Sequence, residues 1–344
     1  MDQSGKKESL VTAWRALDTG SENMEGWRTI PLFTGSTSQI LAGRHFPGGE
    51  EAVLFGFRIS RMPVRTQLPE GNGFSVTAVG VFPGMTDFFW LALTHQIAGS
   101  IELFTMMATD IVETFLDSGS LPPETLVMIF LGRVLAWQNF MQKGKGGVLG
   151  PEEETGLFGE LVVLQAMIDT GVHPAVAVGY WTGPLDALHD FSINAGGIEV
   201  KTTASSGEMI VKITSMEQLD DTLASPLYLA GIRLKRDEGG RNLPEYAQEI
   251  QQVFRPFPDA LTVFETRLLH AGFAWSLSDR YTRRFRVQKK RLLQVNSHFP
   301  RLTRQCVPSA IPSVRYAINL DSINHPDQPL TDILTTLGAV CDGT

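Results

Sequence analysis

The stretch His189–Gly207, HDFSINAGGIEVKTTASSG, places two acidic side chains and one lysine close together in the chain. Asp190 opens a short run of alternating polar and apolar residues, and Glu199 and Lys201 alternate with apolar residues in a second run. The glycines between the two runs favour a tight turn, because glycine adopts positive φ angles without strain. The stretch therefore predicts a β-hairpin around which the rest of its domain is organised.

The alternation of side chains along each strand predicts which of them share a face. A two-residue turn at 195–196 would pair Asp190 with Lys201. A turn one residue earlier would pair Asp190 with Glu199. Both registers place the three charged side chains on one face and the apolar set on the other. The sequence leaves the choice between the two registers open.

A face that carries two carboxylates and one ammonium group suits a divalent metal ion. Two close carboxylates repel each other and raise the pKa of one of them, and a cation between them removes this conflict. Mg²⁺ prefers oxygen ligands, keeps several waters and takes one or two protein carboxylates. A lysine beside it can orient an attacking water or stabilise charge on a phosphate. The alternative is an ordinary half-exposed strand pair, in which Asp–Lys neighbours are common.

The order of these residues resembles the PD-(D/E)XK signature of restriction endonucleases and related repair enzymes. Asp190, a short gap and the run IEVK (198–201) match the signature, although His189 stands where the proline would be. The run 156–219, which contains GLFGEL, HDFSI, IEVKTT and SMEQL, is similar to a bacterial group of uncharacterised PD-(D/E)XK proteins found near restriction and phage-defence genes. The resemblance extends over most of the chain.

This resemblance implies a restriction-endonuclease-like core with the element order αβββαβ. It implies that Asp190 and Glu199 bind Mg²⁺, for which Mn²⁺ substitutes, and that Glu160 on the preceding helix assists them. It also implies that Lys201 positions the attacking water and that Gln218, in the helix after the hairpin, helps to position the site. These five residues are the predicted catalytic residues.

Glu160 has support from its own segment. The predicted helix 155–171 carries Leu157 and Leu164 three and four positions away from Glu160, which marks that side of the helix as inward-facing. A carboxylate on an inward-facing side requires a partner. The alternative is a solvated helix residue.

Basic residues are concentrated in one part of an acidic chain. The net charge of the 344 residues is −8, yet the segment 280–304 has nine Lys or Arg residues and no Asp or Glu. Such a segment suits a phosphate backbone, and its alternative is a solvated helix face or strand edge. The residues predicted to bind DNA are Arg283, Arg284, Arg286, Lys289, Lys290 and Arg291.

The pattern of apolar stretches predicts an α+β protein whose core is α/β. Residues 1–150 form an N-terminal domain with a small antiparallel sheet and two helices, and within it we expect residues 1–25 to be flexible. Residues 151–236 form the nuclease core, and residues 237–344 form a C-terminal extension of helices and strands. Within the core, we expect a strand over 175–181 and a short helix over 215–223.

The composition excludes several classes of protein. Two cysteines are too few for a disulfide framework or a zinc cluster. We expect a cytoplasmic protein without a membrane span, since no run of about 20 apolar residues is present. The predicted function is Mg²⁺-dependent cleavage of DNA in a restriction or phage-defence system, by a homodimer or beside other proteins of that system. The rivals are an inactive nuclease-fold subunit that binds DNA or assembles, and an unrelated hydrolase.

Overall fold

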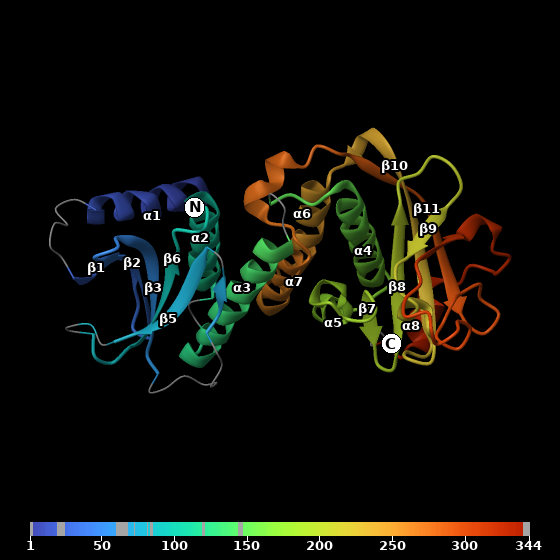
Figure 1. The fold of residues 1–344 in the computed structure, drawn as a ribbon, viewed down its shortest axis with the longest axis horizontal. Coiled ribbons are helices and arrows are strands. Elements are labelled where there is room, and N and C mark those ends of the chain that lie inside the picture. Colours follow the sequence, from blue (N-terminus) through green and yellow to red (C-terminus); the bar gives the residue numbers. More distant parts are fainter. Residues whose placement is uncertain are drawn as a thin grey trace. The chain divides into compact units, whose positions relative to one another are not determined.

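The protein divides into two compact units, Met1–Gln142 and Lys143–Thr344. The computed structural model describes residues 3–18, 25–59, 68–71, 73–80, 82, 85–118, 121–143 and 147–339. Figure 1 shows the elements of each unit in the order in which they occur. None of the described helices is both long and apolar enough to cross a bilayer.

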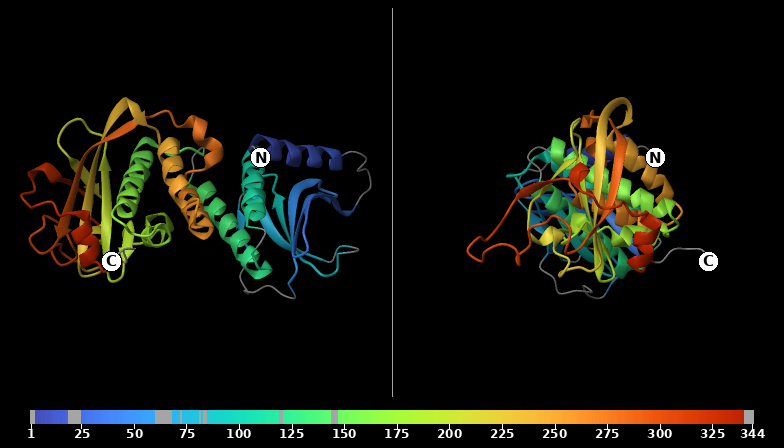
Figure 2. Two further views of the ribbon diagram at one scale, coloured as in Figure 1. Left: turned by 180° about the vertical axis from the view of Figure 1, so that it is seen from behind. Right: turned by 90° about the vertical axis from the view of Figure 1, so that its right-hand side faces the viewer.

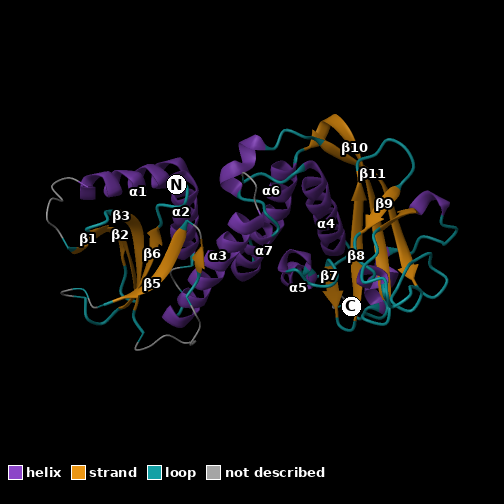
Figure 3. Cartoon of the chain, viewed as in Figure 1, coloured by secondary structure: helices purple, strands orange, loops and turns teal. Residues whose placement is uncertain are grey.

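A six-stranded antiparallel sheet forms the centre of the first unit, with the order β1-β2-β3-β6-β5-β4. Two helices, α2 (Ile101–Asp117) and α3 (Pro123–Lys143), pack against one face of it (Figure 3). Phe55 lies with its ring centroid 5.3 Å from that of Phe115 and 4.7 Å from that of Phe130, so one strand contacts both helices. The strands are β1 (Gly26–Thr34), β2 (Ser38–Phe46), β3 (Glu50–Phe57), β4 (Glu70–Gly71), β5 (Phe74–Val79) and β6 (Phe89–His95).

Helix α1 (Gln3–Asp18) corrects the prediction that residues 1–25 are flexible. Trp14 is buried, and its Nε1 donates a hydrogen bond to the Ala52 carbonyl at 2.8 Å. The helical spacing of the apolar residues explains this packing, because it gives the helix one buried side. The buried residues of α1 are Leu10, Ala13, Trp14 and Leu17. Residues 1–2 and 19–24 lie outside the described residues.

A mixed four-stranded sheet forms the centre of the second unit, with the order β11-β10-β8-β7. The hairpin strands β7 and β8 are antiparallel, β8 and β10 are parallel, and β10 and β11 are antiparallel. These strands are β7 (Phe191–Ile193), β8 (Gly196–Thr203), β10 (Leu227–Arg241) and β11 (Phe285–Val295). The predicted boundary at 236/237 falls inside β10, so residues on both sides of it build one sheet.

Helices cover one face of this sheet (Figure 2). Helix α4 (Pro151–Asp169) packs on β8, where Leu161 and Leu164 join Ile198 and Val200 in one buried cluster. Helix α4 also contacts α6 (Leu243–Phe254), which contacts α7 (Pro258–His270). Gly159 permits the close approach of α4 to β8, since a methyl group there would overlap Thr202 Oγ1.

The other face of the sheet is covered by a small two-stranded sheet, β9 (Ile210–Ile213) paired with β12 (Tyr316–Asn319). Val211 and Ile213 belong to a buried cluster with Leu229 and Leu293 of the central sheet. A short helix, α8 (Leu330–Thr336), follows near the C-terminus. Strand β9 is therefore paired with β12 and not with a strand of the central sheet.

Two predicted elements of this unit are wrong. The stretch 175–181 is a helix, α5 (Pro174–Tyr180), rather than a strand, because Pro174 begins it and His173 Nδ1 accepts a hydrogen bond from the Ala175 N–H. A short apolar run does not distinguish a strand from a buried helix. The predicted helix over 215–223 is only a 3-10 turn, Glu217–Leu219. The fold is α+β, with antiparallel and mixed sheets.

Candidate active site

The hairpin adopts one of the two predicted registers. Phe191 pairs with Ile198 and Ile193 pairs with Gly196, which is the register that places Asp190 beside Glu199. The residue with positive φ in the turn is Asn194, at 52°, and not a glycine. Gly196 is required for a different reason, because a methyl group there would overlap the Pro226 carbonyl oxygen.

Asp190 lies where strand β7 begins and is held by the backbone on two sides. Its Oδ2 accepts a hydrogen bond from the Val200 N–H at 2.7 Å. Its carbonyl oxygen accepts hydrogen bonds from the N–H groups of Thr182 and Gly183 at 2.8 and 2.9 Å. β7 starts one residue later, so the carboxylate takes the place of a strand partner for Val200. Desolvation raises the pKa of Asp190, while Lys201 and the Val200 N–H oppose this shift.

Glu199 and Lys201 project from β8 as a buried ion pair. Lys201 Nζ lies 2.5 Å from Glu199 Oε1, and the Glu199 side chain is only 3% exposed. Burial raises the pKa of Glu199 to about 8, and the neighbouring Asp190 carboxylate adds to the shift. Burial alone would lower the pKa of Lys201, but the attraction of Glu199 and Asp190 outweighs it and raises that pKa. The lysine is therefore held as a cation beside two acids.

Glu160 reaches the same place from helix α4. Its Oε2 accepts a hydrogen bond from Trp181 Nε1 at 2.7 Å. Burial raises the pKa of Glu160 well above its ordinary value, and Asp190 and Glu199 raise it further. A methyl group on Gly183 would lie 2.7 Å from Asp190 Oδ1 and 3.1 Å from Glu160 Oε2. The carboxylate of Glu160, from α4, and that of Asp190, from the residue before β7, thus both lie against Gly183.

These contacts bring four of the five predicted catalytic residues, Glu160, Asp190, Glu199 and Lys201, together beside β8. Within the described ranges, no group of three or more His, Cys, Asp or Glu side chains is arranged to hold a metal ion. The donor chemistry nevertheless fits Mg²⁺, which takes one or two protein carboxylates and completes its shell with water. Asp190 raises the pKa of both Glu160 and Glu199, and a divalent cation relieves repulsion of this kind. The side chains present thus suit the predicted Mg²⁺ site.

Gln218 takes a different position from the other four. Its Oε1 accepts hydrogen bonds from the Thr214 N–H at 2.9 Å and from Thr214 Oγ1 at 3.1 Å. The side chain therefore stabilises the turn after β9.

His189 is buried, and its Nε2 has no hydrogen-bond partner among the described residues. Burial lowers the pKa of His189, which favours the neutral ring.

Most of the predicted DNA-binding residues are paired with acidic side chains from distant parts of the chain. Arg283 pairs with the fully buried Glu154, whose position is 129 residues earlier. Arg284 pairs with Glu245 through two hydrogen bonds, at 2.9 and 2.7 Å. Arg286 pairs with Asp237 at 2.9 Å, and its side chain remains 62% exposed. These ion pairs neutralise much of the charge that the sequence shows as unbalanced.

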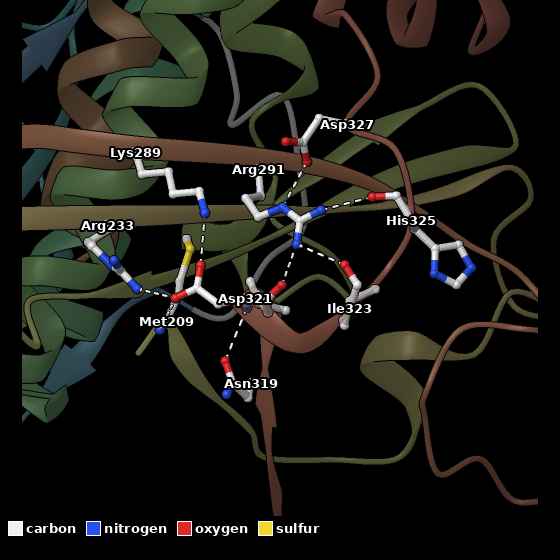
Figure 4. Close-up of polar contacts among 10 residues, drawn as sticks. Met209, Arg233, Lys289, Arg291, Asn319, Asp321, Ile323, His325 and Asp327 are labelled. Carbon is white, nitrogen blue, oxygen red and sulfur yellow. Dashed lines mark hydrogen bonds and ion pairs between the residues drawn. The ribbon is translucent and has the colours of Figure 1, made fainter. Parts of the chain in front are cut away.

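The last three cations lie on β11 and differ in exposure. Lys289 Nζ donates to Asp321 at 2.8 Å, and Asp321 also accepts from Arg233 at 2.6 Å (Figure 4). Arg291 is buried and donates to the carbonyl groups of residues 320, 323 and 325 and to an acid at 327 (Figure 4). Lys290 is exposed and has no ion pair with any residue that the structure describes. Arg291 therefore stabilises the fold, whereas the side chains of Lys290 and Arg286 remain accessible to solvent.

Two residues of the site were not predicted from the sequence. Trp181 and Gly183 lie between α5 and β7, and both contact the carboxylates. The signal was the stretch WTGP at 181–184, next to the hairpin, which contains a tryptophan and a glycine before a proline. The predicted strand over 175–181 gives no indication that Trp181 reaches the site.

Comparison with known proteins identifies a family for this chain. A family model described as "Putative PD-(D/E)XK family member, (DUF4420)" matches residues 10–321. No curated protein and no solved structure matches the chain. The matched range includes Glu160, Asp190, Glu199 and Lys201. Since the match spans well over half of the sequence, the chain belongs to this PD-(D/E)XK family.

Proposed function

We propose that the protein is a Mg²⁺-dependent DNA endonuclease of a restriction or phage-defence system. The observation that carries the proposal is the convergence of one buried carboxylate, two half-buried carboxylates and one lysine beside β8, in a chain of a PD-(D/E)XK family. The proposal includes action in the cytoplasm on DNA, as a homodimer or beside other proteins of the system.

Asp190 and Glu199 would hold the metal ion, with Glu160 assisting. When bound, Mg²⁺ supplies charge stabilisation for the phosphate oxygens and the leaving oxygen. Lys201, held by Glu199, orients the attacking water and faces the negative charge that develops on the phosphate. Attack of this water on phosphorus forms a new P–O bond and breaks the bond to the 3′ oxygen. Trp181 donates to Glu160, and Gly183 lies against Asp190 and Glu160.

Substitution of Lys201 tests the proposal directly. Lys201→Met keeps most of the side-chain volume and removes the charge, so we expect plasmid nicking in Mg²⁺ to fall by about 100-fold or more. The matched control is Lys212→Met, because Lys212 is a 71%-exposed lysine on β9. The double variant Glu199→Gln/Lys201→Met removes both members of the ion pair and serves if Lys201→Met alone does not fold. Unchanged nicking by folded variants would refute the mechanism.

The inactive DNA-binding subunit is the second candidate, since no three-ligand group is preassembled in the described residues. Titration calorimetry with Mn²⁺ separates it from an enzyme. An enzyme binds Mn²⁺ with an affinity that falls on substitution of Asp190→Asn or Glu199→Gln. A subunit that lost catalysis and metal binding shows no heat that depends on either residue.

A further inference from the structure

Trp181 connects helix α5 to the carboxylate of Glu160. The indole is fully buried, and its ring centroid lies 6.1 Å from that of Phe264 on α7. Its Nε1, which can only donate, bonds Glu160 Oε2 at 2.7 Å. The bond therefore holds one oxygen of Glu160 in a fixed place, next to the Gly183 backbone and Asp190.

The residues that follow Trp181 hold the second acid. The N–H groups of Thr182 and Gly183 donate to the Asp190 carbonyl oxygen, and Trp181 forms an isolated bridge with Phe191 at the start of β7. One three-residue segment thus fixes Glu160 through a side chain and Asp190 through its backbone. The relative placement of the two acids depends on where this segment lies.

Arg267 of helix α7 fixes the end of α5 that leads into this segment. Its Nη1 donates to the carbonyl oxygens of Val178, at 2.5 Å, and of Trp181. Contacts of 3.4 Å to the Gly179 carbonyl complete the set. Desolvation lowers the pKa of Arg267 to about 10, so the guanidinium remains charged at neutral pH. A half-buried charged group requires such partners, and the hydrogen-bond partners of Arg267 among the described residues are backbone oxygens.

We propose that Trp181 is the positioning residue for Glu160, and that Arg267 positions Trp181 by holding the end of α5. The inference rests on the proposed function of the same site. A glutamate side chain has several rotamers, and an indole N–H that selects one of them removes the entropy cost of ordering it on metal binding. Partners that orient a metal ligand typically affect metal affinity or activity by about 10- to 100-fold when removed.

Trp181→Phe tests the inference, because it removes the N–H donor and keeps an aromatic ring in the core. We expect Mn²⁺ affinity, measured by calorimetry, and the nicking rate each to fall by about tenfold or more. The matched control is Trp275→Phe. Trp275 packs edge-to-face against Phe273 with the ring centroids 5.0 Å apart, and its Nε1 has no hydrogen-bond partner among the described residues. The control should retain both properties. Equal behaviour of the two folded variants would overturn the inference.

A double-mutant cycle separates positioning from a general structural role. If Trp181 acts through Glu160, the variant Glu160→Gln/Trp181→Phe binds Mn²⁺ no more weakly than Glu160→Gln alone. Additive losses would mean that Trp181 acts elsewhere and would contradict the inference. If Glu160→Gln has no effect on metal affinity or nicking, the role of Glu160 in the proposed function fails instead, which keeps the two failures distinct.

Arg267→Ala tests the second half of the inference. We expect it to reproduce the loss of Mn²⁺ affinity seen in Trp181→Phe, and the combined variant to lose little more than either alone. Arg255→Ala is the control, since Arg255 is an exposed arginine at the end of α6. Circular dichroism establishes that each variant is folded. A folded Arg267→Ala protein with the Mn²⁺ affinity of the control would remove Arg267 from the proposal.

Discussion

Lys201 Nζ lies 2.5 Å from Glu199 Oε1, although both side chains leave the same strand two residues apart. The pair is buried, with exposed fractions of 16% for the lysine and 3% for the glutamate. Because side chains two apart share a face of a strand, the lysine is on the same side as the acid. Asp190 completes this arrangement from the neighbouring arm of the hairpin and contributes to the pKa shifts of both residues.

A buried ion pair predicts an asymmetric response to substitution. Lys201→Met alone leaves the Glu199 and Asp190 carboxyls without their counter-charge, and we expect it to lower the free energy of unfolding by about 1–3 kcal/mol, because Glu199 can take up a proton instead of remaining a buried anion. Glu199→Gln/Lys201→Met removes both charges and should cost less than Lys201→Met. Urea unfolding of the metal-free proteins at pH 7 gives the comparison. A double variant less stable than Lys201→Met would show that the two side chains do not form a coupled pair.

Gly183 gives a second test that involves no change of charge. A methyl group at this position would press on Asp190 Oδ1 at 2.7 Å and on Glu160 Oε2 at 3.1 Å. We expect Gly183→Ala to lower nicking activity and Mn²⁺ affinity by about tenfold or more, because it separates the two acids. Gly179→Ala is the control, since a methyl group on Gly179 of α5 meets no atom within 4 Å. Similar activity of both variants would show that the carboxylates tolerate the displacement.

The hairpin illustrates how far the sequence alone could predict the site. Alternation determines which residues of a strand share a face, so the sequence places Glu199 and Lys201 together. The choice of register could not be made, because it depends on contacts outside the hairpin. Gly196 lies against the Pro226 carbonyl, and Asn194, whose side chain bonds the carbonyl groups of residues 337 and 338, takes the positive φ.

The basic segment shows what a local reading of charge misses. Composition correctly locates cations at 280–304, but it cannot show which acids fold back onto them. Glu154 and Asp321 lie 129 and 32 residues from their partners Arg283 and Lys289. The prediction of a strand over 175–181 is wrong for a different reason. A seven-residue apolar run is too short for its periodicity to distinguish a helix from a strand.

Lys290 is the residue of the basic segment that we expect to contribute most clearly to DNA binding. It is exposed on β11 and has no ion pair within the described part of the chain, so binding a phosphate would break no existing contact. Lys290→Ala should weaken binding to all DNA sequences alike and reduce the slope of log K against log salt by about 1. Fluorescence anisotropy over a range of salt concentrations measures both. Lys212→Ala, on β9, is the control, and an equal effect of both substitutions would show that the basic segment has no special role.

Asp321 predicts a dependence of stability on pH. Hydrogen bonds from Lys289, the Met209 N–H and Arg233 hold the pKa of this carboxyl well below its ordinary value (Figure 4). A carboxyl whose pKa is lower in the folded state stabilises the fold at a pH above its unfolded value, about 4, and loses this contribution as the pH falls further.

Asp321→Asn should therefore lower the free energy of unfolding by about 1–3 kcal/mol at pH 7, and the difference from the wild type should shrink as the pH falls below about 4. Asp321 lies in the segment that follows β12. We therefore expect the substitution to weaken the pairing of β9 with β12 rather than the hairpin. Urea unfolding at pH 7 and pH 3 gives the two differences. Asp259→Asn, at an exposed aspartate of α7, is the control and should change little at either pH. A constant difference between wild type and Asp321→Asn at both pH values would show that the ionised carboxyl contributes nothing, and that only the shape of the side chain matters at this position.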